Sequence, residues 1–335
     1  MSTHEAWHAR YAKLVAACTV LLIAAGGMVT STGSGLSVPD WPTTYGWNMF
    51  TFPLKHWVGG IRYEHSHRLI ASTVGFLTII LAVWTWRVEP RAWVRKLGFA
   101  ALGTVILQGL LGGITVLFFL PPAISIAHAG LAQIFFCLTI TMALVTSRGW
   151  KSNAAPVDDA LLRRAAAVTT ALVYVQILLG ATMRHNDAGL AIPDFPLAFG
   201  HLVPPAWSAK VAIHFAHRVG ALLVTLGVVA TAGHVLYHHR GRRELVRPVV
   251  LLLFFLGVQV TLGAFVIWSG KNPLINTAHV VNGALVLGTS LLLTLRTFRA
   301  GDQRLVQPIH GGAVHGFPGQ GRQGGVGLAS SGAKS

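Results

Sequence analysis

Four histidines stand at matching places in the chain, and histidine is the residue type best suited to bind a transition metal. They are His67, His128, His217 and His279, and each lies near the start of a long apolar segment. Two of them belong to related motifs, EHSHR at residues 64–68 and HFAHR at residues 214–218. Neutral imidazoles on facing helices suit the two axial positions of a haem iron. The pattern therefore favours one bis-histidine haem site in each half of the chain.

Two other interpretations of these histidines remain open from the residues alone. Histidines near a membrane surface can keep their polar ends in water without binding a metal. Structural zinc takes four ligands and catalytic zinc takes three, whereas each half offers one clear pair and no carboxylate from a second helix. The repetition at matched positions favours haem over both alternatives.

One carboxylate distinguishes the two halves. Glu64 stands three residues before His67 and so shares a helix face with it, whereas the alignment puts His214 at this position in the second half and sets His65 against Phe215. A carboxylate beside a bound macrocycle can move protons or stabilise positive charge. The alternative is an acid favoured by the dipole of the first helical turn. We predict that Glu64 is catalytic, with the first half as the reaction site and the second half as an electron carrier.

Three arginines near the same end of the predicted helices are candidates for contacts with haem propionates. They are Arg68, Arg184 and Arg218. A guanidinium group matches the planar geometry of a carboxylate and can bind it through two hydrogen bonds. Ordinary extension of long cationic side chains toward the membrane surface is the competing explanation.

The segments that carry these residues are predicted to be membrane-spanning helices. Hydrophobic residues make up 53% of the 335 residues and charged residues only 11%, whereas about 25% is usual in a soluble domain. Apolar runs long enough to cross a hydrocarbon core of about 30 Å recur along the chain. We predict an all-α polytopic membrane protein with spans at about 12–30, 66–86, 97–119, 124–146, 162–184, 210–236, 248–269 and 275–297.

The distribution of positive charge predicts the orientation in the membrane. The net charge is +16, but most Lys and Arg residues lie in the short loops on the same side as the two termini. That placement follows the positive-inside rule and needs no nucleic-acid partner. We predict cytoplasmic termini, with residues 1–11 before the first span, a cytoplasmic linker at 147–161 and a disordered Gly-rich cytoplasmic tail at 298–335.

The chain also repeats itself. The segment GLSVPDWPTTYG begins at Gly35 and GLAIPDFPLAFG begins at Gly189. A Gln followed four residues later by a Gly occurs at Gln108, Gln176 and Gln259, and we expect each Gln to form a hydrogen bond between helices. The repeat predicts two tandem four-helix bundles, residues 12–146 and 162–297, related by a pseudo-twofold axis along the membrane normal.

These motifs together resemble those of the haem A synthase family. The resemblance covers about residues 12–297 and is carried by ExxHR at Glu64–Arg68, HxxHR at His214–Arg218, the histidines His128 and His279, the two Gly-Leu loops and the Gln-Gly pairs. Val38 and Thr44 stand where many family members have a cysteine pair, and Thr30 stands where many have an arginine. The resemblance therefore leaves a thiol role in this loop without residues to carry it.

The resemblance implies a specific chemistry. A ring methyl group of haem O would be oxidised, through a hydroxymethyl stage, to the formyl group of haem A, which serves haem-copper terminal oxidases. His67 and His128 would hold the substrate haem O, His217 and His279 would ligate a haem B, and Glu64 would be needed for the oxidation. Implied partners are an electron donor or acceptor, the farnesyltransferase that makes haem O and terminal oxidase assembly factors, in a bacterial plasma membrane.

Two competing functions use the same residues. A di-haem b-type cytochrome would exchange electrons with quinone, and a haem carrier would perform no redox chemistry. A pure electron conduit has less use for a lone carboxylate beside one of its two sites. The difference between Glu64 and His214 therefore favours an enzyme that oxidises haem itself.

Overall fold

The computed structural model describes residues 3–151 and 157–299 and is almost entirely helical there. Eight of its helices are long and apolar enough to cross a membrane, which confirms the predicted all-α polytopic fold. They are α1 (Thr3–Ser31), α2 (Ile61–Val88), α3 (Ala92–Leu117), α4 (Pro122–Val145), α6 (Ala160–His185), α7 (Ala209–His238), α8 (Arg243–Trp268) and α9 (Pro273–Phe298). The short helices α5 (Arg148–Lys151), η1 (Met49–Thr51) and η2 (Leu54–His56) lie in connecting segments.

The lengths of the long helices follow from the solvent that they cross. A chain in hydrocarbon must satisfy its backbone polar groups internally, and a helix does so within one segment. The eight helices have 24 to 30 residues, or roughly 36 to 45 Å at 1.5 Å per residue. They extend beyond the predicted apolar runs because polar residues cap them: Ser208 Oγ accepts a hydrogen bond from the Val211 amide, and Asn272 Oδ1 accepts one from the Leu274 amide.

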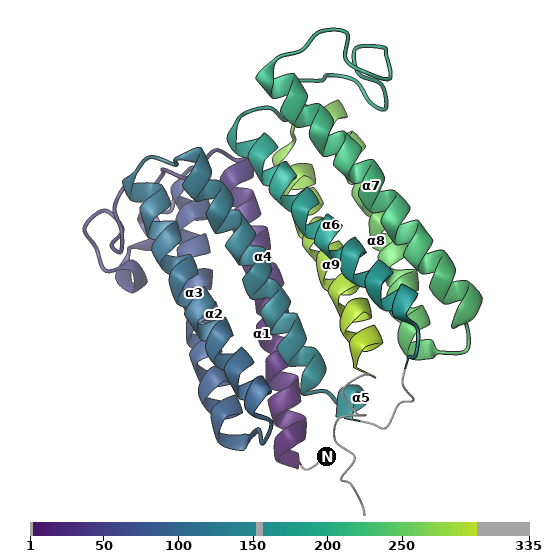
Figure 1. The fold of residues 1–335 in the computed structure, drawn as a ribbon. Coiled ribbons are helices and arrows are strands. Elements are labelled where there is room, and N and C mark those ends of the chain that lie inside the picture. Colours follow the sequence, from purple (N-terminus) through teal and green to yellow (C-terminus); the bar gives the residue numbers. More distant parts are fainter. Residues whose placement is uncertain (1–2, 152–156, 300–335) are drawn as a thin grey trace, which may run out of the picture.

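The helices form two bundles that lie side by side (Figure 1). Helix α1 packs against α2 and α4, and α3 packs against α2 and α4; helices α6 to α9 contact one another in the corresponding pairs. Contacts of α9 with α1 and α4, and of α4 with α6, join the bundles. Ile23, Phe136 and Ala284 form a buried cluster from both bundles. This arrangement agrees with the predicted tandem bundles, whose origin by duplication stays a prediction.

Both described ends of the chain lie at one end of the molecule. Lys151 Nζ on α5 lies 2.6 Å from Glu5 Oε1 at the start of α1. Arg299 Nη1, just after α9, donates to the Gly149 carbonyl oxygen at 2.9 Å. The predicted linker at 147–161 thus contains the short helix α5, and its residues 152–156 lie outside the described residues. The predicted disordered tail at 298–335 also lies outside them, apart from its first two residues.

Candidate functional site

The two Gly-Leu segments fold into loops with matching hydrogen bonds. Asp40 accepts hydrogen bonds from the amides of Tyr45 and Gly46, and Asp194 accepts them from Phe199 and Gly200. Gly46 and Gly200 have φ angles of 75° and 77°, which glycine adopts without steric penalty. Burial acts to raise the pKa of Asp40, but hydrogen bonds from Gly46, Thr43 and Tyr45 outweigh it and lower the pKa.

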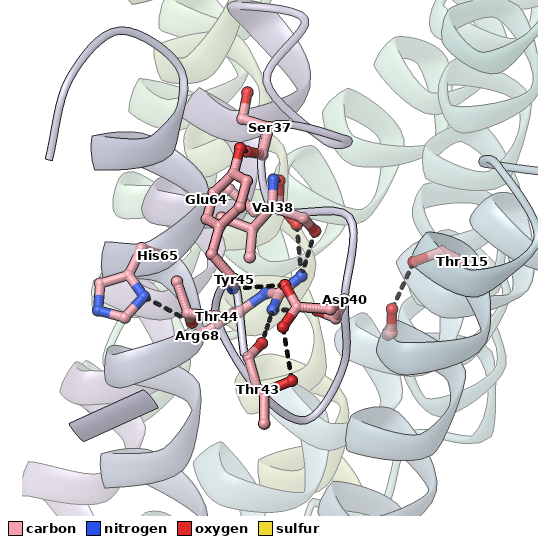
Figure 2. Close-up of polar contacts among 11 residues, drawn as sticks. Ser37, Val38, Asp40, Thr43, Thr44, Tyr45, Glu64, His65, Arg68 and Thr115 are labelled. Carbon is pink, nitrogen blue, oxygen red and sulfur yellow. Dashed lines mark hydrogen bonds and ion pairs between the residues drawn. The ribbon is translucent and has the colours of Figure 1, made fainter. Parts of the chain in front are cut away.

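An arginine holds each loop against a helix (Figure 2 shows the first). Arg68 on α2 donates to the carbonyl oxygens of Val38, Asp40 and Thr43 at 2.7 to 3.0 Å. Arg218 on α7 donates to the equivalent carbonyl oxygens, those of Ile192, Asp194 and Leu197. The guanidinium groups of two of the three predicted propionate contacts are thus the anchors of the loops.

The residue that differs between the halves bonds to the same point of each loop. The Val38 amide donates to Glu64 Oε2 at 2.8 Å, and Glu64 Oε1 lies 2.8 Å from Arg68 Nη2 (Figure 2). In the second half the Ile192 amide donates to His214 Nδ1 at 3.2 Å. Glu64 and His214 are each 3% exposed. Each loop is therefore also held at this second position, by an ion-paired carboxylate in the first half and by an imidazole in the second half.

His65 serves the first loop only. Its Nδ1 lies 3.1 Å from Thr44 Oγ1, and its ring packs against Phe52 and Trp57. Its counterpart in the second half, Phe215, packs edge-on against Trp207. This position therefore supports the loops through ring packing and is separate from the four matched histidines.

Each of the four matched histidines packs against a glycine on the neighbouring helix. A Cβ atom added to the glycine would lie 3.0 to 3.2 Å from the Cε1 atom of the imidazole. The pairs are Gly26 with His67, Gly112 with His128, Gly180 with His217, and Gly263 with His279. All four histidines lie in the first three turns of their helices and are half-buried. Sequence reasoning missed Gly26. The signal that could have found it is its spacing, because Gly26 lies four residues after Leu22 just as Gly180 lies four residues after Gln176.

The histidines of each half approach one another from separate helices. His67 on α2 and His128 on α4 are close enough for their charges to interact, as are His217 on α7 and His279 on α9. The Gln residues bond to the adjacent helix as predicted, and specifically to three of these histidines. Each pair offers two imidazoles from two helices, which is the donor set of bis-histidine haem ligation.

Buried polar atoms at the first pair also fit a metal ligand. His67 Nδ1 and His128 Nδ1 are buried and, among the described residues, have no hydrogen-bond partner. The glycine beside each ring leaves the space that a side chain would otherwise fill. Two imidazoles with such surroundings fit the axial ligation of an iron porphyrin, and the same glycine packing occurs at the second pair.

Arg184, the third predicted propionate contact, lies between the two bundles. Its Nη2 atom donates to the Gly27 carbonyl oxygen at 3.0 Å and to Ser31 Oγ at 2.6 Å, so that α6 is bonded to α1. Thr277 on α9 also donates to Ser31 Oγ, at 3.1 Å. No pattern in the amino-acid sequence points to Ser31, because its role depends on how the two bundles pack.

A second group of polar residues lies near the N-terminal end of α6, away from the four histidines. Asp159 Oδ2 lies 2.7 Å from His234 Nε2 and 2.8 Å from His239 Nε2. Its other oxygen, Oδ1, accepts from the Leu162 amide and caps α6. Burial acts to raise the pKa of Asp159, but the hydrogen bonds from His234, Leu162 and His239 outweigh it and lower the pKa. This group ties the start of α6 to the end of α7.

The fold and the site define a class: a multi-pass helical membrane protein whose two bundles each present a pair of imidazoles beneath an anchored loop. The chain belongs to the COX15-CtaA family, described as cytochrome oxidase assembly protein, whose model matches residues 61–291.

Several curated proteins are similar to most of the chain. A protein named heme A synthase from Geobacillus kaustophilus is 28% identical over 301 residues, which cover 87% of this chain and 92% of that protein. Proteins of the same name from Shouchella clausii and Halalkalibacterium halodurans are 29% and 28% identical, over 82% and 81% of this chain and 90% of each relative.

Proposed function

We propose that this chain is a haem A synthase, a membrane oxidoreductase that converts a ring methyl group of haem O to the formyl group of haem A. Membership of the family and the names of the relatives support this activity. The observation that carries the proposal is the buried Glu64 in the first half, at the position where the second half has His214. A protein that only conducts electrons would have no need for this difference.

The two histidine pairs take different roles in the proposal. His67 and His128 hold the substrate haem O, and His217 and His279 hold a resident haem B. When bound, haem B supplies one-electron redox chemistry. The glycines beside the four imidazoles set the depth at which each ring sits, and the facing helices set the spacing between the two rings of a pair.

Glu64 is held one helical turn from His67 by the ion pair with Arg68 and by the hydrogen bond from the Val38 amide. Because both carboxylate oxygens are engaged, movement of a proton at Oε1 or Oε2 requires one of these bonds to loosen. The loop also packs against α3 next to the glycine of His128, since the Trp41 ring lies where a side chain on Gly113 would be, and Gly112 contacts the His128 ring. The first half thus combines a held carboxylate with a loop that packs beside the His128 ring.

The proposal also assigns roles to three arginines and to partner proteins. Arg68, Arg184 and Arg218 lie at the end of the bundles that carries the histidines, where they can share their donors with haem propionates. The oxidation requires an electron donor or acceptor, and the farnesyltransferase that makes haem O and assembly factors of terminal oxidases are the proposed neighbours. The placement of Lys and Arg supports cytoplasmic termini in a bacterial plasma membrane.

The proposal is tested by expressing the chain in membranes that contain haem O and separating the extracted pigments by chromatography. The wild-type chain should produce haem A. Glu64→Gln keeps an acceptor for the Val38 amide but removes the charge, so it should retain bound haem and lose nearly all haem A. Its matched control is His214→Gln, at the same position in the second half.

Each outcome separates the competing functions. Haem A from the wild type and from His214→Gln, but not from Glu64→Gln, supports the proposal. Bound haem O that is never oxidised by the wild type would contradict it and favour a carrier or a di-haem cytochrome. Haem A formation at a normal rate by Glu64→Gln would remove Glu64 from the catalytic role.

A further inference from the structure

The four imidazoles do not have equivalent surroundings, because glutamines contact three of them. Gln176 Nε2 lies 3.0 Å from His217 Nδ1 and donates to the His217 carbonyl oxygen at 2.8 Å. Gln108 donates to the His128 carbonyl oxygen at 2.9 Å, and Gln259 Nε2 lies 3.2 Å from His279 Nε2. Each glutamine stands four residues before the glycine that packs on the same imidazole. Leu22 stands four residues before Gly26, so His67 lacks this partner.

A second position near the imidazole also differs between the two halves. Gly220 leaves the space that the Gln176 side chain occupies, because a Cβ atom there would overlap Gln176 Oε1. Gly220 is three residues after His217, and the residue three after His67 is Ile70. Leu22 and Ile70 both pack against the apolar cluster of Val74, Ala101 and Phe135. The first half thus has two apolar side chains, Leu22 and Ile70, at the positions where the second half has Gln176 and Gly220.

The consequence is a difference in how firmly each ring is held in place. His67 Nδ1 is buried without a partner among the described residues. Each of the other three rings is held by a glutamine whose Nε2 atom donates to the histidine carbonyl oxygen or lies 3.2 Å from a ring nitrogen. A neighbouring group that orients a ligating imidazole contributes to the site, and its loss typically weakens metal binding by about 10- to 100-fold.

We propose that His67 is the exchangeable axial ligand, at which the first half takes up and releases its haem, whereas the glutamine-supported histidines hold iron firmly. This inference rests on the proposed function, in which the first half must release its product and the second half keeps its haem. Gln108, Gln176 and Gln259 are then positioning residues, and Leu22 with Ile70 sets the lability of the substrate site.

The test introduces the Gln and Gly residues into the first half and replaces them by Leu and Ile in the second half. Full-length chains carrying Leu22→Gln with Ile70→Gly, or Gln176→Leu with Gly220→Ile, are reconstituted with haem B as the probe. The other half is silenced in each case by His217→Ala or His67→Ala, and wild-type halves are measured in the same backgrounds. Release to excess apomyoglobin and the low-spin fraction of the optical spectrum are recorded.

The expected result is reciprocal. Release from the first half should slow by about tenfold in Leu22→Gln with Ile70→Gly, and release from the second should accelerate by about tenfold in Gln176→Leu with Gly220→Ile. A gain in retention cannot come from structural damage. Equal release rates from the two wild-type halves, or no change in either double variant, would overturn the inference.

A separate measurement keeps the two proposals apart. If one double variant does not fold, Gln108→Leu alone should accelerate release from the first half, and an unchanged rate counts against the inference. Haem A formation by the wild-type chain tests the proposed function on its own. Normal haem A formation with equal release rates would refute only the assignment of His67 as the exchangeable ligand.

Discussion

Replacement of Gly180 by alanine should separate haem binding from folding. The added Cβ atom would lie 3.0 Å from His217 Cε1, whereas carbon atoms pack best at roughly 3.5 to 4.0 Å. The imidazole must therefore move by about 0.5 Å. Overpacking of this kind costs about 1 to 3 kcal/mol, and alanine in a helix interior returns about 0.5 to 1 kcal/mol relative to glycine. The apoprotein should lose no more than roughly 2.5 kcal/mol.

The effect on haem should be larger than the effect on the fold. A ligand displaced by this amount should weaken haem binding in the second half by roughly 10- to 100-fold, the range seen when the support of a ligand is removed. Haem per chain and the optical spectrum are measured after purification, and thermal unfolding of the apoprotein is measured in parallel. The matched control is Gly257→Ala on α8 of the same half, where the new Cβ atom has no neighbour within 4 Å.

The comparison with the control decides the outcome. Gly257→Ala should keep the wild-type haem content and spectrum, whereas Gly180→Ala should lose haem while remaining folded. If Gly180→Ala binds haem as tightly as Gly257→Ala, the imidazole of His217 does not lie against this glycine when iron is bound. The reasoning that the four glycines set the ring positions would then be refuted.

Three further predictions follow from contacts outside the histidine pairs. Gly113→Ala would put a Cβ atom 2.5 Å from the Trp41 ring and should lower the free energy of unfolding by about 1 to 3 kcal/mol. Adding Trp41→Phe to this variant should restore the stability, as measured by thermal unfolding. Arg184→Ala loses the bonds to Gly27 and Ser31 and should destabilise the contact between the bundles by about 1.5 to 3 kcal/mol, so equal stability would contradict its bridging role. The folded pKa of Asp40 is below its ordinary value of 3.8; its stabilisation is therefore complete above that pH and is lost as pH falls through the folded pKa. Limited proteolysis of the loop should increase in acid for the wild type, and Asp40→Asn should show no such transition.

The direction of the acid effect follows from the loop bonds. The ionised carboxylate of Asp40 accepts three hydrogen bonds from its own loop, from Thr43, Tyr45 and Gly46. Protonation removes acceptor capacity, while Arg68 still holds the backbone of the same loop. We therefore expect the loop to loosen locally before the helices unfold, and the backbone next to Tyr45 to be cut by protease first.

The amino-acid sequence by itself determined the membrane-spanning helices and the repeated motifs. Apolar run length is a local property, and hydrocarbon leaves the backbone few alternatives to a helix. The matched spacing of the four histidines predicted two pairs, since residues at one depth on neighbouring helices can approach one another. The Gln-Gly pairs likewise predicted bonds between helices, which the structure confirms for Gln108, Gln176 and Gln259.

Only the tertiary structure decided which groups meet across long separations in the chain. Arg184 was predicted to contact a propionate, but its observed partners on α1 follow from the packing of one bundle against the other. The bond from the Val38 amide to Glu64 depends on how the loop returns to α2, and that of Asp159 with His234 depends on where α7 ends. Such contacts join residues tens of positions apart, so their geometry is fixed by packing and cannot be read from local composition or spacing.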